Sequence, residues 1–161
     1  MQIKFYIIFF ISMKISAHDD GAYSHSQNDA RRNHAESMEK LDQNIRLNKL
    51  NIPRTHNSGA IYDGFSGDIA NTQTLTIEQQ LSAGIRFMDI RLRDMGNGLF
   101  IYQDLVYQNL SFSDVLSSAS VFLDDNPSET IEMRVQEKHT PSNNTQGFKA
   151  TVKSYTESYP I

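Results

Sequence analysis

The chain of 161 residues contains no cysteine, and its 15 Lys and Arg are outnumbered by 19 Asp and Glu. Without cysteine, disulfides and thiolate chemistry are both excluded. The formal net charge of −4 argues against a nucleic-acid-binding protein, because such a protein needs a basic face. Beyond the first 17 residues no apolar run is long enough to cross a bilayer, so that part of the chain predicts no transmembrane helix.

The first 17 residues have the pattern of a secretory signal peptide. Lys4 supplies a positive start, an apolar run of nine residues covers 5–13, and Ile15-Ser16-Ala17 offers a cleavage site. Nine residues cover about half of a bilayer, which makes a transmembrane helix the weaker interpretation and leaves a buried N-terminal strand as the alternative. We therefore expect a secreted, extracellular protein with its signal peptide at 1–17.

Residues 18–36 form a polar stretch, which we expect to be a mobile N-terminus. A metal-binding tract is the alternative, and the irregular spacing of its three histidines, His18, His25 and His34, disfavours it. With 39% apolar residues the whole chain has enough hydrophobic side chains for one packed domain, which we place at 37–161.

Hydrophobic periodicity divides residues 37–161 into alternating helices and strands, an order that indicates an α/β fold. Thr76 is predicted to N-cap a helix with Gln79 as its capping-box partner, and Ser113 is predicted to N-cap another. The Asn97-Gly98 turn is short, so its flanking strands form either a hairpin or an irregular barrel step. The first predicted helix begins near Ala30, with its clearest apolar spacing from Met38 to Leu47. The other predicted helices run from Thr76 to Gly84, Ser113 to Asp125 and Thr145 to Ser158, and the predicted strands cover about 50–55, 85–93, 99–103 and 129–136.

The first predicted strand ends in a polar loop that carries His56. A loop histidine presented by a buried strand is a common catalytic group, and in an α/β barrel the strand ends build the active site. Arg91 suggests a clamp for an anion such as phosphate beside this histidine. Asp89 could orient the histidine or pair with Arg91 or Arg93. A structural histidine and a structural ion pair are the plainer interpretation of the same residues.

Three segments, in matching order and spacing, resemble one family. The sequence IPGTHDSG, a strand and loop in bacterial, metal-independent phosphatidylinositol-specific phospholipase C catalytic (X) domains, is similar to Ile52-Pro53-Arg54-Thr55-His56-Asn57-Ser58-Gly59. The family's QLxxGxRxxDIR segment resembles Gln79 to Arg91. Its FLxxNPSETI joint, between a helix and a strand, resembles Phe122 to Ile131. The resemblance covers roughly residues 43–158.

The resemblance implies an α/β fold, a TIM-like (β/α) barrel of which this chain holds about the first half. It implies cleavage of phosphatidylinositol, or a related anionic phospholipid, at a membrane surface to diacylglycerol and a cyclic inositol phosphate. His56 matches the general base that deprotonates the inositol 2-hydroxyl, Arg91 matches the arginine that stabilises the phosphate, and Asn57 and Asp89 would support them. Metal-dependent relatives carry a carboxylate at the position of Arg91, so we expect neither a metal ion nor another cofactor.

The chain departs from the family pattern at several positions. Asn57 stands where the bacterial pattern has aspartate. Gln103 aligns with the family's second histidine, the general acid, and a glutamine amide cannot transfer a proton at neutral pH. Gln136 aligns with an inositol-binding lysine, while Lys138 lies two residues further on. The later strands of the barrel, which carry more ligands in the family, have no counterpart in this sequence.

These departures leave an alternative function open. A catalytically impaired or truncated relative would bind an anionic headgroup or a partner protein through the same pocket, with Arg54, Arg91 and Arg93 supplying the charge. Arg54, Gln136 and Lys138 are the candidate substrate-binding residues in either case. A metal-dependent glycerophosphodiesterase is disfavoured, because only Asp89 is well placed as a carboxylate ligand. An open barrel edge further predicts self-association.

Overall fold

The computed structural model describes residues 33–42, 44–62 and 70–159. The predicted signal peptide at 1–17 and most of the polar stretch at 18–36, with His18 and His25, lie outside the described residues. None of the described helices is both long and apolar enough to cross a membrane.

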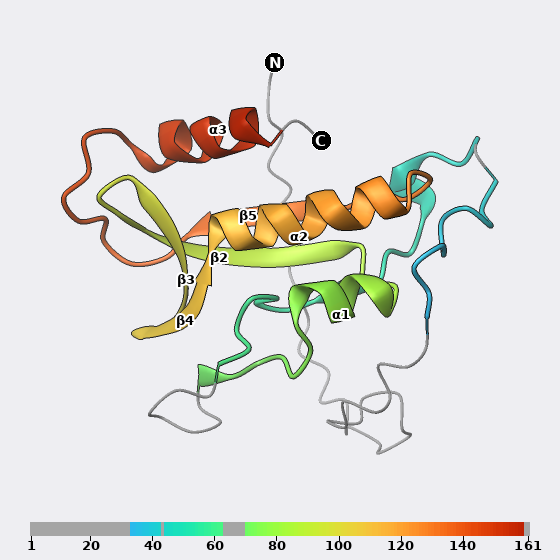
Figure 1. Cartoon of the computed structure of the whole chain (residues 1–161), viewed down its shortest axis with the longest axis horizontal. Helices are drawn as coiled ribbons and strands as arrows, with labels where there is room; N and C mark the ends of the chain where they lie inside the picture. The colour runs from blue at the N-terminus through green and yellow to red at the C-terminus, as the bar shows by residue number, and fades with distance from the viewer. Residues whose placement is uncertain (1–32, 43, 63–69, 160–161) are drawn as a thin grey trace.

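A five-stranded sheet organises the described chain around its longest strand, β2 (Figure 1). Strands β1 and β5 pair parallel with opposite edges of β2, because Phe87 pairs with both of them. Strand β3 continues antiparallel from the far end of β2, and β4 pairs antiparallel with β3. The strands are β1 (Arg54–Thr55), β2 (Phe87–Met95), β3 (Gly98–Gln103), β4 (Val106–Ser111) and β5 (Glu132–Glu137).

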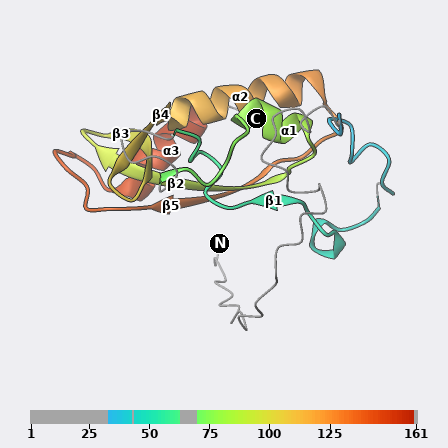
Figure 2. The same ribbon diagram turned by 90° about the horizontal axis from the view of Figure 1, so that it is seen from below.

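Helices cover one face of this sheet. Figure 2 shows α1 (Ile77–Ser82) and α2 (Phe112–Asp125) on the side away from β1 and β5. The third helix, α3 (Phe148–Ser158), follows β5 and packs on β3, where the Tyr155 hydroxyl accepts a hydrogen bond from the Leu99 N–H at 3.3 Å. The Tyr155 ring also contacts Phe112 of α2, with the ring centroids 5.7 Å apart. The sheet and its helices form the curled layers of an incomplete α/β barrel.

The two faces of β2 have opposite chemistry, as its period-2 pattern predicts. Met88, Ile90 and Leu92 are fully buried in the core beneath the helices. Asp89, Arg91 and Arg93 alternate with them and therefore project from the other face. The same alternation continues on β5. Its Met133 and Val135, together with Ile131 just before the strand, are partly buried and pack on the core. One face of the sheet is thus an apolar base for helices and the other carries charge.

Side-chain capping fixes where α1 and α2 begin. The predicted capping box of Thr76 and Gln79 is present, and Gly84 follows α1 with a φ of +97°, where glycine has no steric penalty. The prediction of Ser113 as the N-cap of α2 is wrong. Ser111 is the N-cap, and its side chain and the Asp114 carboxylate bond reciprocally to each other's backbone N–H. Phe112 is already helical and buried, so the helix begins earlier than its polar start suggested.

The turn at residues 96 and 97 makes a hairpin and not a barrel step. Gly96 and Asn97 both have positive φ, +60° and +64°, which matches the right-handed twist of the flanking antiparallel strands.

Strand β4 was not predicted. It begins after a turn at Asp104 and Leu105, where Asp104 has a φ of +48°. Aspartate tolerates this conformation, but without glycine the turn gives a weak sequence signal.

The predicted helix from Met38 to Leu47 is wrong. The described residues of this segment form turns, and the only regular element nearby is a 3₁₀ helix, η2 (Leu47–Lys49). Leu41, Ile45 and Leu47 are each about two-fifths exposed, so the apolar spacing does not mark a buried stripe. Instead of helical hydrogen bonds, the backbone N–H groups of Met38 and Glu39 donate to the Glu129 carboxylate.

Glu129 and Arg86 form a buried ion pair that joins three parts of the chain. The Arg86 Nε donates to Glu129 Oε2 at 2.7 Å, and both side chains are at most 1% exposed. The remaining guanidinium nitrogens of Arg86 donate to the carbonyls of Leu81 and Ala35, among others. This pair and its hydrogen bonds therefore tie the amino ends of β2 and β5 to α1 and to the segment that precedes β1.

We expect Arg86→Met to lower the free energy of unfolding by about 3–5 kcal/mol, because Glu129 would stay buried without its cation. Urea unfolding followed by circular dichroism measures this change. Lys153→Met is the control, since Lys153 and Glu157 form an exposed pair and its loss should cost under about 0.5 kcal/mol. The double variant Arg86→Met/Glu129→Leu should recover part of the loss; no recovery would contradict the buried-charge explanation.

Candidate active site

His56 lies directly after β1, at the point where this short strand leaves the sheet. Its side chain is 68% exposed, so a ligand can reach the imidazole. The backbone beneath it is fixed by the loop at 70–76: the His56 carbonyl accepts hydrogen bonds from Gln73 Nε2 at 2.7 Å and from Thr72 Oγ1 at 3.3 Å. An exposed imidazole is thus carried on a fixed backbone.

Ser58 fastens this loop to β2. The Ser58 N–H donates to the Asp89 carbonyl at 2.8 Å, and the Asp89 N–H donates to Ser58 Oγ at 2.9 Å. On the helix side, the buried Gln80 amide donates to the Ser58 carbonyl and accepts a hydrogen bond from Thr55 Oγ1. These bonds extend the pairing of β1 and β2 beyond Thr55, and they place Asp89 level with His56.

His56, Asp89 and Arg91 meet at this level. Asp89 Oδ2 lies 3.5 Å from His56 Nδ1, which is longer than a strong hydrogen bond, and accepts one from Arg91 Nε at 3.1 Å. Arg91 Nη2 lies 3.3 Å from Nδ1 and 3.2 Å from Nε2 of His56. Nearly equal distances indicate that the guanidinium lies against the ring and is not aligned with one lone pair. The arrangement joins an imidazole, a carboxylate and a guanidinium.

Asn57 connects this group to the β3–β4 turn. It is fully buried, with a φ of +47°, and its N–H donates to Asp89 Oδ2 at 3.1 Å. Its side-chain amide donates to Gln103 Oε1 at the end of β3. The structure therefore brings together His56, Asn57, Asp89, Arg91 and Gln103, which are the five residues predicted to be catalytic.

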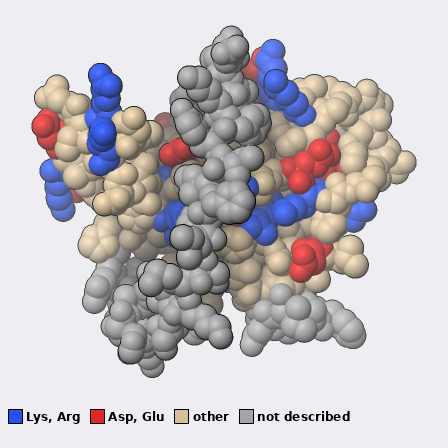
Figure 3. Space-filling view, turned by 180° about the vertical axis from the view of Figure 1, so that it is seen from behind, with Lys and Arg blue, Asp and Glu red and all other residues tan. Residues whose placement is uncertain are grey.

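The three predicted substrate-binding residues lie on β1, on β5 and just after β5. Gln136 pairs in register with Arg91, and Lys138 follows β5, with its N–H donating to the Leu92 carbonyl at 2.6 Å. Arg54 is exposed on β1. Figure 3 views the sheet from the side opposite α2, and there Lys and Arg side chains gather in a band across the middle of the molecule. This side of the sheet suits an anionic ligand.

The sequence did not predict the side-chain hydrogen bonds that hold the His56 loop. They are made by Ser58, Thr55 and Gln80. All three residues lie within the motifs that resemble the family, but the spacing of the motifs does not say which groups bond to each other. Among the described residues no three His, Asp or Glu side chains cluster as a metal ion would require. The positive charge next to His56 is supplied by Arg91.

An incomplete α/β barrel with an exposed histidine and an arginine at one end of its strands defines a candidate phosphodiester-cleaving or phosphate-binding protein. A family model identifies the family: the one described as phosphatidylinositol-specific phospholipase C, X domain, matches residues 43–159. The chain belongs to this family.

Two curated relatives are bacterial. The 1-phosphatidylinositol phosphodiesterase of Listeria monocytogenes serovar 1/2a is 40% identical over 105 residues, which are 63% of this chain and 32% of that protein. The protein of the same name from Staphylococcus aureus strain Newman is 31% identical over 122 residues, 73% of this chain and 39% of that protein. This chain therefore spans well under half the length of either relative.

Solved structures give the same result for the fold. A structure of phosphatidylinositol-specific phospholipase C from Staphylococcus aureus, from work on its membrane binding, superposes with a TM-score of 0.73 at 29% identity, over 81% of this chain and 45% of that one. The Listeria monocytogenes enzyme gives a TM-score of 0.69 at 32% identity, over 79% and 46%. The predicted family and the predicted fold, an incomplete α/β barrel, are confirmed. The roles assigned to individual residues stay predictions.

We expect Asn57→Ala to unfold more easily than Asn57→Gly by about 1 kcal/mol. Both variants lose the contact with Gln103, but only alanine has a Cβ that opposes the left-handed backbone at this position. Urea unfolding of the two variants measures the difference. The exposed Asn143, with a φ of +55°, is a matched site where the same pair of substitutions should give a difference of the same sign. Equal stability of the two Asn57 variants would contradict the loop conformation.

Proposed function

We propose that this protein cleaves the phosphodiester of phosphatidylinositol or a related inositol phospholipid, with diacylglycerol and a cyclic inositol phosphate as products. The observation that carries the proposal is the exposed imidazole of His56 beside the guanidinium of Arg91. The bacterial relatives are named for the same phosphodiesterase activity. Secretion and action at a membrane surface belong to this proposal as well.

His56 acts as the general base in this mechanism. It accepts the proton of the inositol 2-hydroxyl, and the oxygen attacks phosphorus as the bond to the glycerol oxygen breaks. Imidazole suits the step because it exchanges a proton near neutral pH. Asp89, whose Oδ2 lies 3.5 Å from His56 Nδ1, orients the ring for this step.

Arg91 stabilises the negative charge that builds up on the phosphoryl oxygens. Asp89 holds its Nε, and that contact fixes the guanidinium plane while its terminal nitrogens face the imidazole. A fixed donor costs no reorganisation during the reaction and can supply the charge that a metal ion supplies elsewhere. The Arg91 side chain is 17% exposed, so part of the guanidinium remains accessible to a ligand.

The leaving alkoxide is the weak point of the reaction. Gln103 aligns with the family's general acid, and its amide, held by Asn57, can donate a hydrogen bond but no proton. Absence of a general acid typically costs about 10²- to 10⁴-fold in rate. The substitution is the observation that favours a second candidate function, binding of an anionic headgroup without efficient cleavage. Self-association through the open edge of the sheet remains a further proposal.

A calcium-free cleavage assay tests the proposed reaction. We expect the chain to release a cyclic inositol phosphate from phosphatidylinositol vesicles in the presence of EDTA, and His56→Ala to lower the rate by at least about 10²-fold. His34→Gln replaces an exposed histidine outside the site and should leave the rate unchanged. If the folded chain cleaves nothing but binds inositol phosphate, the headgroup-binding function is the correct one.

Gln103→His should restore a proton donor. We expect it to raise the cleavage rate by up to about 10²-fold, because imidazolium can protonate the departing glycerol oxygen. Gln103→Asn keeps an amide and serves as the control, with no gain expected. Product release is measured in the same vesicle assay, from pH 5 to 9. A histidine variant no faster than the asparagine variant at any pH would show that the position does not reach the leaving group.

A further inference from the structure

Gln108 is a polar side chain at a buried position of the sheet. It lies within β4, is 1% exposed, and shares its face of the strand with Leu110, which packs on the core. Burying an amide costs free energy unless its donors and its acceptor find partners. One partner lies within the same strand, where the Val106 carbonyl accepts a hydrogen bond from Gln108 Nε2 at 3.4 Å. The other partners described for this amide lie outside β4.

These other partners belong to the loop that follows β1. The loop leaves the strand as an outgoing arm, residues 57–62, and comes back as a returning arm, residues 70–73. On the outgoing arm, the Tyr62 N–H donates to Gln108 Oε1 at 2.9 Å. On the returning arm, the Ala70 carbonyl accepts from Gln108 Nε2 at 3.4 Å. One side chain of the sheet thus joins the two arms of the loop.

The returning arm in turn holds the backbone of His56. The Ala60 carbonyl accepts hydrogen bonds from the N–H groups of Thr72 and Gln73, both at 3.0 Å. The same two residues donate from their side chains to the His56 carbonyl, Gln73 Nε2 at 2.7 Å and Thr72 Oγ1 at 3.3 Å. Thr72 Oγ1 also lies 3.2 Å from the Asn57 carbonyl oxygen. A shift of the returning arm would therefore move the backbone that carries the imidazole.

We propose that Gln108 is a positioning residue for His56. By joining the two arms of the loop, it keeps the imidazole against Arg91 in the orientation that proton transfer requires. The path is short, because Ala70 lies two residues before Thr72. Within the part of the chain that the structure describes, no hydrogen bond joins Gln108 to His56 or Arg91, so the effect passes through the loop. The inference rests on the proposed function, in which His56 is the base.

A purely structural role for Gln108 predicts a different result. The amide would then stabilise the fold, and its loss would lower the free energy of unfolding without changing how His56 lies in molecules that stay folded. A positioning role predicts a change within the folded state, because a displaced base no longer meets its proton in the productive geometry. The two roles are separated by a control substitution that also removes a buried polar group but lies away from the loop.

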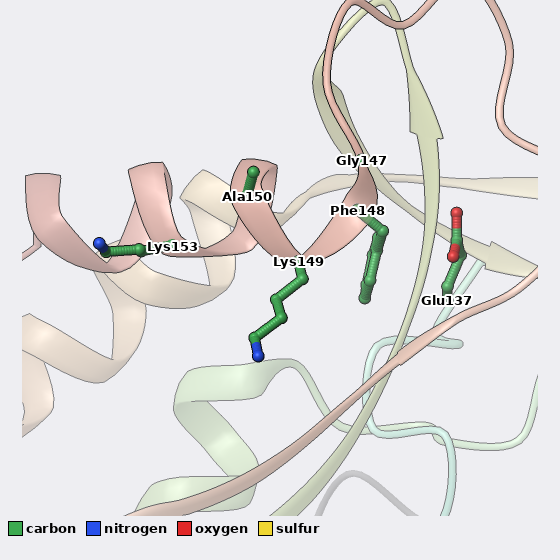
Figure 4. Close-up of a pocket in the computed structure, with 6 residues that line it drawn as sticks. All are labelled: Glu137, Gly147, Phe148, Lys149, Ala150 and Lys153. Carbon is green, nitrogen blue, oxygen red and sulfur yellow. The ribbon is translucent and has the colours of Figure 1, made fainter. Parts of the chain in front are cut away.

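Thr151 provides this control. It is 1% exposed, and its Oγ1 donates to the buried Asp94 carboxylate at 3.1 Å, so Thr151→Val also removes a buried hydrogen bond. The residue belongs to α3, whose Lys149 and Lys153 line a hollow beside the end of β5 and not the His56 loop (Figure 4). We therefore expect Thr151→Val to lower stability without affecting the site.

The first measurement follows the His56 ring by NMR in the full chain, with His56→Gln used to assign its Cε1–H signal. We expect Gln108→Met, which has a similar length but no amide, to shift and broaden this signal, and Thr151→Val to leave it in place. An unchanged His56 signal in folded Gln108→Met, or an equal change in Thr151→Val, would overturn the proposal. If Gln108→Met does not fold, Gln108→Asn decides in the same way, because its amide is one methylene too short to reach both arms.

The second measurement uses the calcium-free vesicle assay. We expect Gln108→Met to lower kcat by about tenfold or more and to change KM by less than about twofold, because a misplaced base weakens the chemical step and leaves substrate binding intact. Thr151→Val should keep both values. A rise in KM with kcat unchanged would overturn the proposal. If the unsubstituted chain cleaves nothing, the proposed function fails, and the NMR comparison still decides whether Gln108 positions His56.

Discussion

The buried ion pair between Arg86 and Glu129 is the interaction on which the arrangement of the chain depends. Two charges removed from water are stable only if each finds several partners, and these two do. The guanidinium donates to the carbonyls of Leu81 in α1 and of Ala35, and the carboxylate accepts from the backbone N–H groups at 38 and 39. Arg86 immediately precedes β2, and Glu129 lies three residues before β5. Their pairing holds the amino ends of two parallel strands at one level and therefore sets which residues lie opposite each other further along the sheet.

The site follows from that alignment. With β2 and β5 in register, Asp89 and Arg91 project from the charged face beside Gln136, and the short strand β1 delivers His56 to the same level. Ser58 completes the placement, because its backbone and hydroxyl both bond to Asp89. One carboxylate oxygen, Asp89 Oδ2, then serves as the common acceptor for the Asn57 N–H and the Arg91 guanidinium. Loss of this oxygen would disturb His56, Arg91 and the loop together.

Two features separate this chain from the family pattern. Gln103 stands where the family has its second histidine, and an amide does not ionise near neutral pH, so under the proposed mechanism this position supplies no proton to the leaving group. The match spans 32% of the Listeria monocytogenes protein and 39% of the Staphylococcus aureus protein. Under the proposed function, His56 and Arg91 carry the reaction and Gln103 limits it.

The sequence by itself determined the family, the α/β order, most helix and strand positions and the five residues that meet at the site, because these are encoded in local motifs and short periodic patterns. It misplaced the N-cap of α2, missed β4 and assigned a helix to Met38–Leu47, where the apolar spacing is real but no neighbouring surface buries it. Only the tertiary structure decided those points and the contacts of Ser58, Gln80 and Glu129. Their long-range partners lie 22 to 92 residues away in the chain, and no local pattern specifies which distant group a buried polar atom will bond.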